Sequence, residues 1–271
     1  MKCAFLLACV VGLFVSDIAA NISELRNAEI SSRKQTTTQE KGGTYVFYQH
    51  PQYPRDCSEV YNQCEGRSPD GVYLIKPEDF LKPFEVFCNN SIDGGGWTVF
   101  QRRLDGSVDF NRSWTEYKNG FGFLRREFWL GNGKIAYLTN QKTYELRIDL
   151  NNVNGEPYFA KYNLFRISDE RTKYRLVGLG NYNSNSTTTY DAMDTSRNQY
   201  FTTYDQENDA HTDFHCARLH HGGWWYYMCS QARLNSLYQS KSAPDITIVW
   251  ANLPGGRNQL KYTEMKIRPL T

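Results

Sequence analysis

Apolar and polar residues alternate along several short segments of the chain. In YELRIDL, residues 144–150, single charged side chains separate the apolar ones, which is the pattern of a β-strand with one face toward solvent. WTVFQRR at residues 97–103 follows the turn DGGG, and TIVW at residues 247–250 is a short apolar run. Both segments predict further strands.

Helical patterns are fewer. In SWTEYKNGF, residues 113–121, a serine or threonine can cap the first turn, and LRREFWLGN, residues 124–132, predicts a helix that ends at Gly131. Strands therefore dominate, and the sequence predicts a mixed, mainly antiparallel α+β fold.

The N-terminal segment, residues 1–20, has the pattern of a secretory signal peptide. One lysine precedes an apolar run that is too short to span a bilayer comfortably, and small residues follow. No later segment is apolar enough for membrane insertion, so we expect a secreted, extracellular protein that starts near Asn21. Residues 21–47 are polar and lack heptads and Gly-X-Y repeats, which predicts a linker before a globular domain at residues 48–271.

Composition narrows the class of partner and the chemistry of the cysteines. The 31 basic and 29 acidic residues give a net charge of +2, which excludes the strongly basic surface that nucleic acids require. Of the seven cysteines, Cys3 and Cys9 lie in the predicted signal peptide, and the others favour disulfides in an oxidising compartment. The sequons that are candidates for N-glycosylation are Asn21, Asn89, Asn111 and Asn185.

One segment, YDQENDAHTDFHCARLHHGGWWYYMC at residues 204–229, concentrates acidic, imidazole and aromatic side chains. Calcium takes six to eight oxygen ligands, and a loop can supply them from alternate positions. The acidic residues with such spacing are Asp205, Glu207, Asp209 and Asp213. They predict a calcium site, with a solvated acidic loop as the alternative.

The histidines of this segment raise a zinc alternative, because zinc prefers nitrogen and sulfur ligands. They are His211, His215, His220 and His221, and their spacing matches no zinc motif. The chain also lacks the G-x-S-x-G, H-E-x-x-H and P-loop motifs. The sequence therefore favours a binding protein over an enzyme.

Longer blocks occur in an order and spacing that resemble a fibrinogen-like C-terminal domain. They are RDCSEVYNQ, DGVYLIKP, FEVFCNN, GGGWTVFQRRLDGSVDFNRSWTEYKNGFG, EFWLGN, FTTYDQEND, GGWWYYMC and YTEMKIRPL, and they span roughly residues 55–271. The resemblance implies an α+β fold with a disulfide-bonded N-terminal subdomain and a central antiparallel sheet with short helices. It also implies a loop-rich C-terminal subdomain that carries calcium and a ligand pocket.

The same resemblance assigns the cysteines. It implies one disulfide between Cys57 and Cys88 and a second between Cys216 and Cys229. Cys64 is then left over, and we expect either an intermolecular disulfide or a buried or capped free thiol at this position.

For calcium, the resemblance implies carboxylate ligands from Glu207 and Asp209 and backbone carbonyl ligands from His211 and Asp213. Glu207 stands where the family has aspartate, and its extra methylene moves the carboxylate outward. Three outcomes are then open for calcium: Glu207 still coordinates it in bidentate or water-mediated fashion, the site is weakened, or coordination shifts to Asp205.

For the ligand, the resemblance implies a pocket around the second cysteine of the C-terminal pair. The matching residues are His220, Trp225, Tyr226, Cys229, Ser230, Asn235 and Asp245. Ser230 replaces a histidine with which lectin members hold an acetyl group, and the paired tryptophans 224 and 225 either form a wall or pack in the core. An unusual cis peptide of the family would join Met228 to Cys229.

These features predict a secreted, calcium-dependent lectin that recognises glycans or acetylated groups on microbial or cell surfaces, as in innate immunity. Because the affinity of a single sugar site is usually modest, we also expect a homo-oligomer. The alternative is an extracellular matrix, adhesion or receptor-ligand protein that binds protein partners through the same face.

Overall fold

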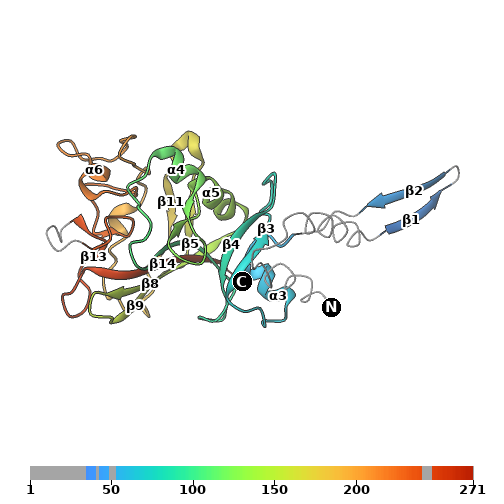
Figure 1. Ribbon diagram of the computed structural model, residues 1–271, viewed down its shortest axis with the longest axis horizontal. Coiled ribbons are helices and arrows are strands. Elements are labelled where there is room, and N and C mark those ends of the chain that lie inside the picture. Colours follow the sequence, from blue (N-terminus) through green and yellow to red (C-terminus); the bar gives the residue numbers. More distant parts are fainter. Residues whose placement is uncertain (1–34, 41–42, 49–52, 240–245, 271) are drawn as a thin grey trace, which may run out of the picture.

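The computed structural model describes the backbone of residues 35–40 and 43–48, and describes residues 53–239 and 246–270 in full (Figure 1). The predicted signal peptide, the sequon at Asn21 and the predicted pocket residue Asp245 lie outside the described residues.

An eight-stranded antiparallel sheet forms the centre of the domain. Its main path runs β3-β4-β5-β14-β8-β9, and the short strands β6 and β7 extend it beside β5. The bounds are β3 (Gly71–Ile75), β4 (Phe84–Asn89), β5 (Trp97–Arg103), β6 (Phe121–Gly122), β7 (Phe128–Trp129), β8 (Tyr144–Asn152), β9 (Pro157–Tyr162) and β14 (Leu260–Pro269). The mainly antiparallel sheet predicted from the sequence is therefore confirmed, and so are the strands at residues 97–103 and 144–150.

Short helices and two-stranded sheets surround this centre. Figure 1 shows α4 and α5 close to one another, with α6 and β13 at the end of the domain away from α3. The helices are α3 (Cys57–Gln63), α4 (Trp114–Asn119), α5 (Asn132–Gln141) and α6 (Cys216–His220), with 3-10 turns η1 (Glu170–Thr172) and η2 (Asp194–Ser196). The small sheets pair β10 (Phe165–Ile167) with β11 (Leu176–Leu179) and β12 (Ala232–Arg233) with β13 (Val249–Trp250), so the strand predicted at residues 247–250 is shorter than expected.

The helix α4 begins where the sequence predicts. The Ser113 side chain accepts a hydrogen bond from the Glu116 amide, and the Glu116 carboxylate accepts one from the Ser113 amide at 2.9 Å. This reciprocal pair is a capping box. The helix predicted at residues 124–132 is wrong, because Phe128–Trp129 form strand β7, and Gly131 immediately precedes α5 instead of ending a helix.

The buried carboxylate of Glu127 explains why this segment is not helical. Glu127 is 0% exposed and lies 3.7 Å from the Arg103 guanidinium. Its two oxygens accept hydrogen bonds from the backbone amides of Leu104, Asp105, Gly106 and Val108. A helix here would separate the carboxylate from these donors, and an unpaired buried charge is costly.

The predicted linker contains regular structure. The strands β1 (Gln35–Glu40) and β2 (Gly43–Tyr48) form an antiparallel hairpin with Gln35 opposite Tyr48. Their threonine, tyrosine, valine and phenylalanine residues favour extended backbone, which the polar composition of the segment concealed.

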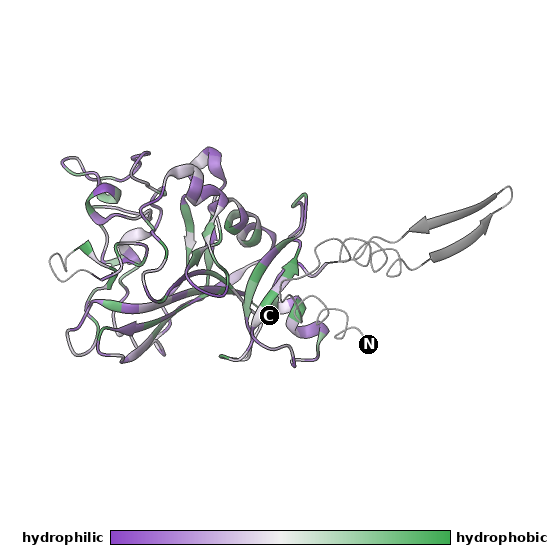
Figure 2. Ribbon diagram, in the orientation of Figure 1, coloured by the Kyte–Doolittle hydropathy of each residue, from purple (hydrophilic) through white to green (hydrophobic). Residues whose placement is uncertain are grey.

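Aromatic rings connect the sheet to the C-terminal subdomain. Phe100 of β5 stacks on Phe165 of β10 with 5.3 Å between centroids, and Trp129 of β7 lies 6.1 Å from Trp225. Phe201 lies between both tryptophans, at 5.8 and 5.2 Å. All five side chains are buried, and Figure 2 shows hydrophobic residues alternating with hydrophilic ones along the strands. The core is therefore continuous from the sheet to the segment around residue 225.

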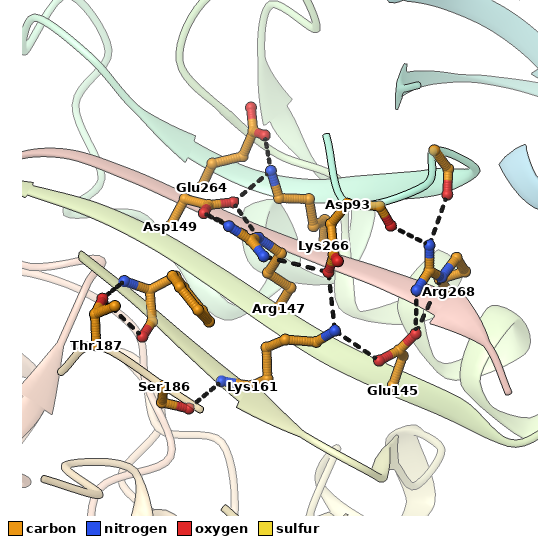
Figure 3. A network of polar contacts seen from close by, with 12 residues as sticks. Asp93, Glu145, Arg147, Asp149, Lys161, Ser186, Thr187, Glu264, Lys266 and Arg268 are labelled. Carbon is orange, nitrogen blue, oxygen red and sulfur yellow. Dashed lines mark hydrogen bonds and ion pairs between the residues drawn. The ribbon is translucent and has the colours of Figure 1, made fainter. Parts of the chain in front are cut away.

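Charged side chains on β14 and its neighbouring strands form a largely buried network of ion pairs (Figure 3). Glu264, which is 2% exposed, accepts from Arg102 at 2.6 Å and from Lys266 at 2.7 Å. Lys266 also lies 2.6 Å from Asp149, which pairs with Arg147 at 2.7 Å. Because removing one partner leaves another charge buried, these groups depend on one another.

The network continues toward the edge strand β9. Asp93 lies 3.2 Å from Arg147 and 2.8 Å from Lys161. Glu145 pairs with Arg268 at 2.7 Å and with Lys161 at 3.4 Å (Figure 3). The contacts therefore link β8, β9 and β14 to the loop before β5.

The titration of Glu264 gives a test of this network. Burial alone would raise the pKa of the Glu264 carboxyl, but the charges of Lys266 and Arg102 lower it from 4.5 to about 2. The stability that this shift contributes is fully present above pH 4.5 and is lost as the pH falls toward 2, where the folded state takes up the proton. We expect Glu264→Gln to lower the free energy of unfolding at pH 7 by about 3–5 kcal/mol, and to make that free energy less dependent on pH in this window.

Urea unfolding at pH 7 and at points between pH 4.5 and 2 measures both effects. Glu65→Gln is the matched control, because Glu65 is exposed and, in the described part of the chain, pairs only with exposed Arg67. It should change the free energy of unfolding by less than about 0.5 kcal/mol. Equal stability of the two variants at pH 7 would contradict the role assigned to Glu264.

Candidate functional site

The loop that precedes α6 is held in place by backbone contacts with the segment around the paired tryptophans. Thr202 and Trp224 exchange backbone hydrogen bonds of 2.9 and 3.1 Å, and the Ala210 amide donates to the Tyr227 carbonyl at 3.0 Å. The Asn208 side chain caps the turn by donating to a backbone carbonyl at 2.8 Å. The acidic loop and the segment that leads to Cys229 therefore form one unit.

Within this loop, Glu207, Asp209 and His215 bring their ligand atoms within 4.8 Å of one another. Asp209 is half-buried and accepts from the amides of His211 and Cys216, both at 3.2 Å. Burial raises the pKa of Asp209 and the nearby Glu207 charge adds to this, while the two amides act in the opposite direction. A cation would relieve the repulsion between the carboxylates, so this donor set fits a metal ion.

The other predicted calcium residues do not join the carboxylate cluster through their side chains. Asp205 accepts from the Trp114 amide at 2.8 Å and from the Thr203 hydroxyl at 2.7 Å, so it connects the loop to the start of α4. The His211 ring accepts from the amides of Asp213 and Phe214, both at 3.2 Å. A shift of coordination to Asp205 is therefore not supported, while the carbonyls of His211 and Asp213 stay predictions.

Among the described residues, only one histidine joins the metal-type cluster. His215 was expected only in the zinc alternative, and no sequence motif marks it, because its approach to Glu207 depends on the path of the loop. His220 is instead 6% exposed and stacks on Tyr226, and burial lowers its pKa to about 3. His220 is therefore a neutral imidazole inside the fold at physiological pH.

Both predicted disulfides are confirmed. Cys57 bonds to Cys88, and Cys216 bonds to Cys229. Cys64 is 5% exposed and is also disulfide-bonded. The structure does not present Cys64 as a free thiol, and an intermolecular bond there stays a prediction.

The aromatic residues predicted to line the ligand pocket are packed in the core. Trp224, Trp225 and Tyr226 are 0% exposed, and the Trp225 indole donates to the Tyr174 carbonyl at 2.8 Å. Tyr226 donates to the Gly222 carbonyl at 2.8 Å. They do not form an exposed wall, and the packing alternative for the tryptophans is confirmed.

The predicted polar pocket groups are also engaged internally. Ser230 is 5% exposed and its hydroxyl bonds to Ser196 at 3.0 Å. The Asn235 amide donates to the Gly223 carbonyl at 3.0 Å and accepts from Gln101 at 3.2 Å. Cys229 is half-buried with φ +59°, and the bond before it is trans, so the expected cis peptide is absent.

The side chains exposed near the Cys216–Cys229 disulfide differ from those predicted to line the pocket. They are Phe214 (59%), Leu219 (44%), Tyr227 (45%) and Met228 (60%), which we call the apolar rim. Each lies within three residues of Cys216 or Cys229 in the sequence. The sequence reasoning did not single out Phe214, Leu219 and Met228, because the exposure of these side chains could not be read from the sequence.

The antiparallel sheet, the two disulfides and the acidic loop beside the second one define a disulfide-stabilised, mainly antiparallel α+β domain. A family model described as "Fibrinogen beta and gamma chains, C-terminal globular domain" matches residues 53–270. The chain belongs to this fibrinogen C-terminal domain family.

Two relatives show the extent of the likeness. Fibrinogen-like protein A of Apostichopus parvimensis is 46% identical over 222 residues, which cover 80% of this chain and 76% of that protein. Fibrinogen C domain-containing protein 1-A of Xenopus laevis is 41% identical over 223 residues, which cover 80% of this chain and 47% of that protein. The chain thus spans about half the length of the Xenopus relative.

Solved structures agree with the fold. The fibrinogen-like globe domain of human ANGPTL2 is 38% identical with a TM-score of 0.73, covering 80% of this chain and 99% of that one. The lamprey fibrin D-dimer, complexed with the peptide ligand Gly-His-Arg-Pro-amide, is 32% identical with a TM-score of 0.69, covering 92% and 84%.

Membership places the chain in a class of generally non-enzymatic binding proteins, and fibrinogen-like proteins are typically extracellular. None of the helices in the described part of the chain has the length and apolar character needed to cross a membrane.

The sequons divide by their surroundings. The Asn89 side-chain amide is half-buried and donates to Glu264 at 3.0 Å, inside the charged network, whereas Asn111 and Asn185 are exposed. A glycan on the Asn89 nitrogen would disturb the partners of a carboxylate that is 2% exposed. We expect glycans at Asn111 and Asn185 and an unmodified Asn89.

Mass spectrometry of tryptic peptides, after enzymatic release of N-glycans in heavy-oxygen water, measures occupancy at each position. A substantially occupied Asn89, or an empty Asn111 together with an empty Asn185, would contradict this assignment.

Proposed function

We propose that this chain is a secreted, calcium-dependent recognition lectin that binds glycans or acetylated groups on microbial or cell surfaces. The observation that carries the proposal is the cluster of Glu207, Asp209 and His215 beside the disulfide that closes the C-terminal subdomain.

The cluster supports calcium rather than a purely structural acidic loop. Glu207 and Asp209 are like charges whose ligand atoms lie within 4.8 Å, and Asp209 is partly desolvated. Calcium accepts carboxylate and backbone carbonyl oxygens together, and the carbonyls of His211 and Asp213 complete the proposed set. Glutamate at position 207 is long enough to reach an ion from an exposed position, at some cost in rigidity.

The same contacts couple the ion to the recognition surface. Asp209 accepts from the amide of Cys216, and Cys216 is bonded to Cys229. The Ala210 amide holds the Tyr227 carbonyl on the other side. An ion that orders Asp209 thereby orders both ends of the segment that carries the apolar rim.

The apolar rim supplies the contact surface in this proposal. The exposed rings of Tyr227 and Phe214 can pack against the C–H faces of a sugar or against an acetyl methyl group. Such a shallow site gives modest affinity, so the proposal includes a homo-oligomer that engages several glycans at once.

Calcium binding is tested first by substitution. We expect calcium to bind with a Kd of about 10⁻⁴–10⁻³ M, as in other extracellular modules, and Asp209→Asn to weaken it at least tenfold. Asparagine keeps an oxygen acceptor for the Cys216 amide, so the fold should persist. Isothermal titration with calcium measures the difference.

Asp213→Asn is the matched control, because its exposed side chain lies outside the carboxylate cluster. It should leave the calcium Kd within about threefold, since only its carbonyl is proposed as a ligand. Equal loss in both variants would contradict the assignment of Asp209. His215→Ala separates the metals, because it should spare calcium and abolish any tight zinc binding.

The lectin activity itself is tested on a glycan array that includes N-acetylated sugars, with calcium and with a chelator. We expect binding that the chelator abolishes and that Asp209→Asn greatly reduces while Asp213→Asn does not. An absence of glycan binding under both conditions would contradict the lectin proposal.

A second candidate is an extracellular protein that binds protein partners through the same face. The composition of the apolar rim favours it, because Leu219 and Met228 add aliphatic surface of the kind found at protein interfaces. The lamprey fibrin relative was solved with a peptide ligand. Binding that persists in the chelator and is lost in Met228→Ser would favour this candidate over the lectin.

A further inference from the structure

A cavity lies away from the acidic loop. It has a volume of about 280 Å³ and is bounded by β4, the β6–β7 hairpin and the first turn of α5. Its lining residues all fall between positions 84 and 134, so it shares none with the apolar rim or the cluster at Glu207. The apolar residues that line it are Phe84, Phe121, Leu124, Phe128, Trp129 and Leu130, and the remaining lining is polar or backbone.

One positively charged side chain, that of Lys134, also lines this cavity. Lys134 Nζ donates to the carbonyls of Asn119 at 3.2 Å and Leu130 at 3.3 Å, and lies 5.6 Å from the centroid of the Phe84 ring. Within the described residues, Lys134 has no carboxylate at ion-pair distance. Burial lowers the pKa of Lys134, so its ammonium form is partly desolvated without the compensation that an anion would give.

The amino end of α5 adds to the positive electrostatic potential of the Lys134 ammonium. Lys134 lies in the first turn of α5, whose residue before the helix, Gly131, provides no side-chain cap. The amino end of a helix carries partial positive charge, so it favours an anion in the same region as the ammonium does.

The cavity is formed by backbone that has little freedom to collapse into it. Gly120 and Gly122 line it with φ of +95° and +86°, and a Cβ at Gly122 would lie 2.2 Å from the Glu127 carbonyl. β6 can therefore approach β7 this closely only with glycine at these positions. Glu127 itself is fixed by its buried hydrogen bonds, so the hairpin that bounds the cavity is preorganised.

We propose that this cavity binds a small organic monocarboxylate, with its apolar body against the phenylalanine rings and its carboxylate on Lys134. Glu85 also lines the cavity and is exposed. Its negative charge disfavours dianions and phosphates, which restricts the class to a single carboxylate on an apolar or aromatic group. The site is independent of the proposed calcium-dependent function.

The probe is 3-phenylpropionate, and the neutral control is 3-phenylpropanamide, which keeps the shape and removes the charge. Ligand-observed NMR titration of the full secreted chain should give a Kd of about 1–5 mM for the acid, as expected for a ligand of this size. The amide should bind at least about tenfold more weakly, because a charge-assisted hydrogen bond is lost.

Lys134→Gln should weaken binding of the acid at least about tenfold while leaving binding of the amide within twofold. Lys76→Gln is the matched control, since Lys76 is an exposed lysine outside the cavity, and it should leave both affinities unchanged. Calcium titration of Lys134→Gln should match the unmodified chain, which separates this proposal from the function at Glu207.

Three results would overturn the proposal. They are no binding of the acid up to about 20 mM, equal affinity for acid and amide, or an unchanged affinity in Lys134→Gln. Because the comparison of acid with amide uses the unmodified chain, the test holds even if Lys134→Gln is poorly folded.

Discussion

The position of β14 between β5 and β8 constrains the whole domain. Along this strand Thr263, Met265 and Ile267 are buried among the core residues, while Glu264 and Lys266 lie in the charged network. Because side chains alternate between the faces of a strand, a shift by one residue would move the charges into the apolar core. The ion pairs thereby fix the register of a strand whose partners are distant in the sequence, since Arg102 of β5 and Glu264 of β14 are 162 residues apart.

This register also determines the position of the acidic loop. β5 pairs with β14 on one edge and with β7 on the other, and β7 presents Trp129 to Trp225. Trp225 anchors the segment that ends at Cys229, and the disulfide to Cys216 places the start of α6 beside it. The acidic loop is therefore positioned by the core, although its own side chains are largely exposed.

The sequence indicated the strands at residues 97–103 and 144–150, because their patterns reflect contacts on one face of a sheet. It misassigned residues 124–132, because the four amides that hold Glu127 come from a distant turn. Family resemblance supplied both disulfide pairings, whereas the acidic loop was predicted from the spacing of its carboxylates.

The predicted ligand pocket differs from the observed surface because most of the predicted pocket side chains are buried. Trp225 and Tyr226 were predicted to line a pocket, but rings from four other segments cover them, and no local sequence pattern indicates this. For the same reason the sequence did not indicate Lys134, and it indicated His215 only as one of several candidate zinc ligands. Each gains its surroundings from segments that are brought together only by the fold.

The central claim is that a calcium ion at Glu207 and Asp209 orders the recognition surface through Cys216 and Tyr227. Amide hydrogen exchange with and without calcium measures this directly. The account predicts slower exchange at residues 207–216 and 226–229 when calcium is present, with no change in β5, β8 or β14. Identical exchange of these loop segments in both conditions would contradict it.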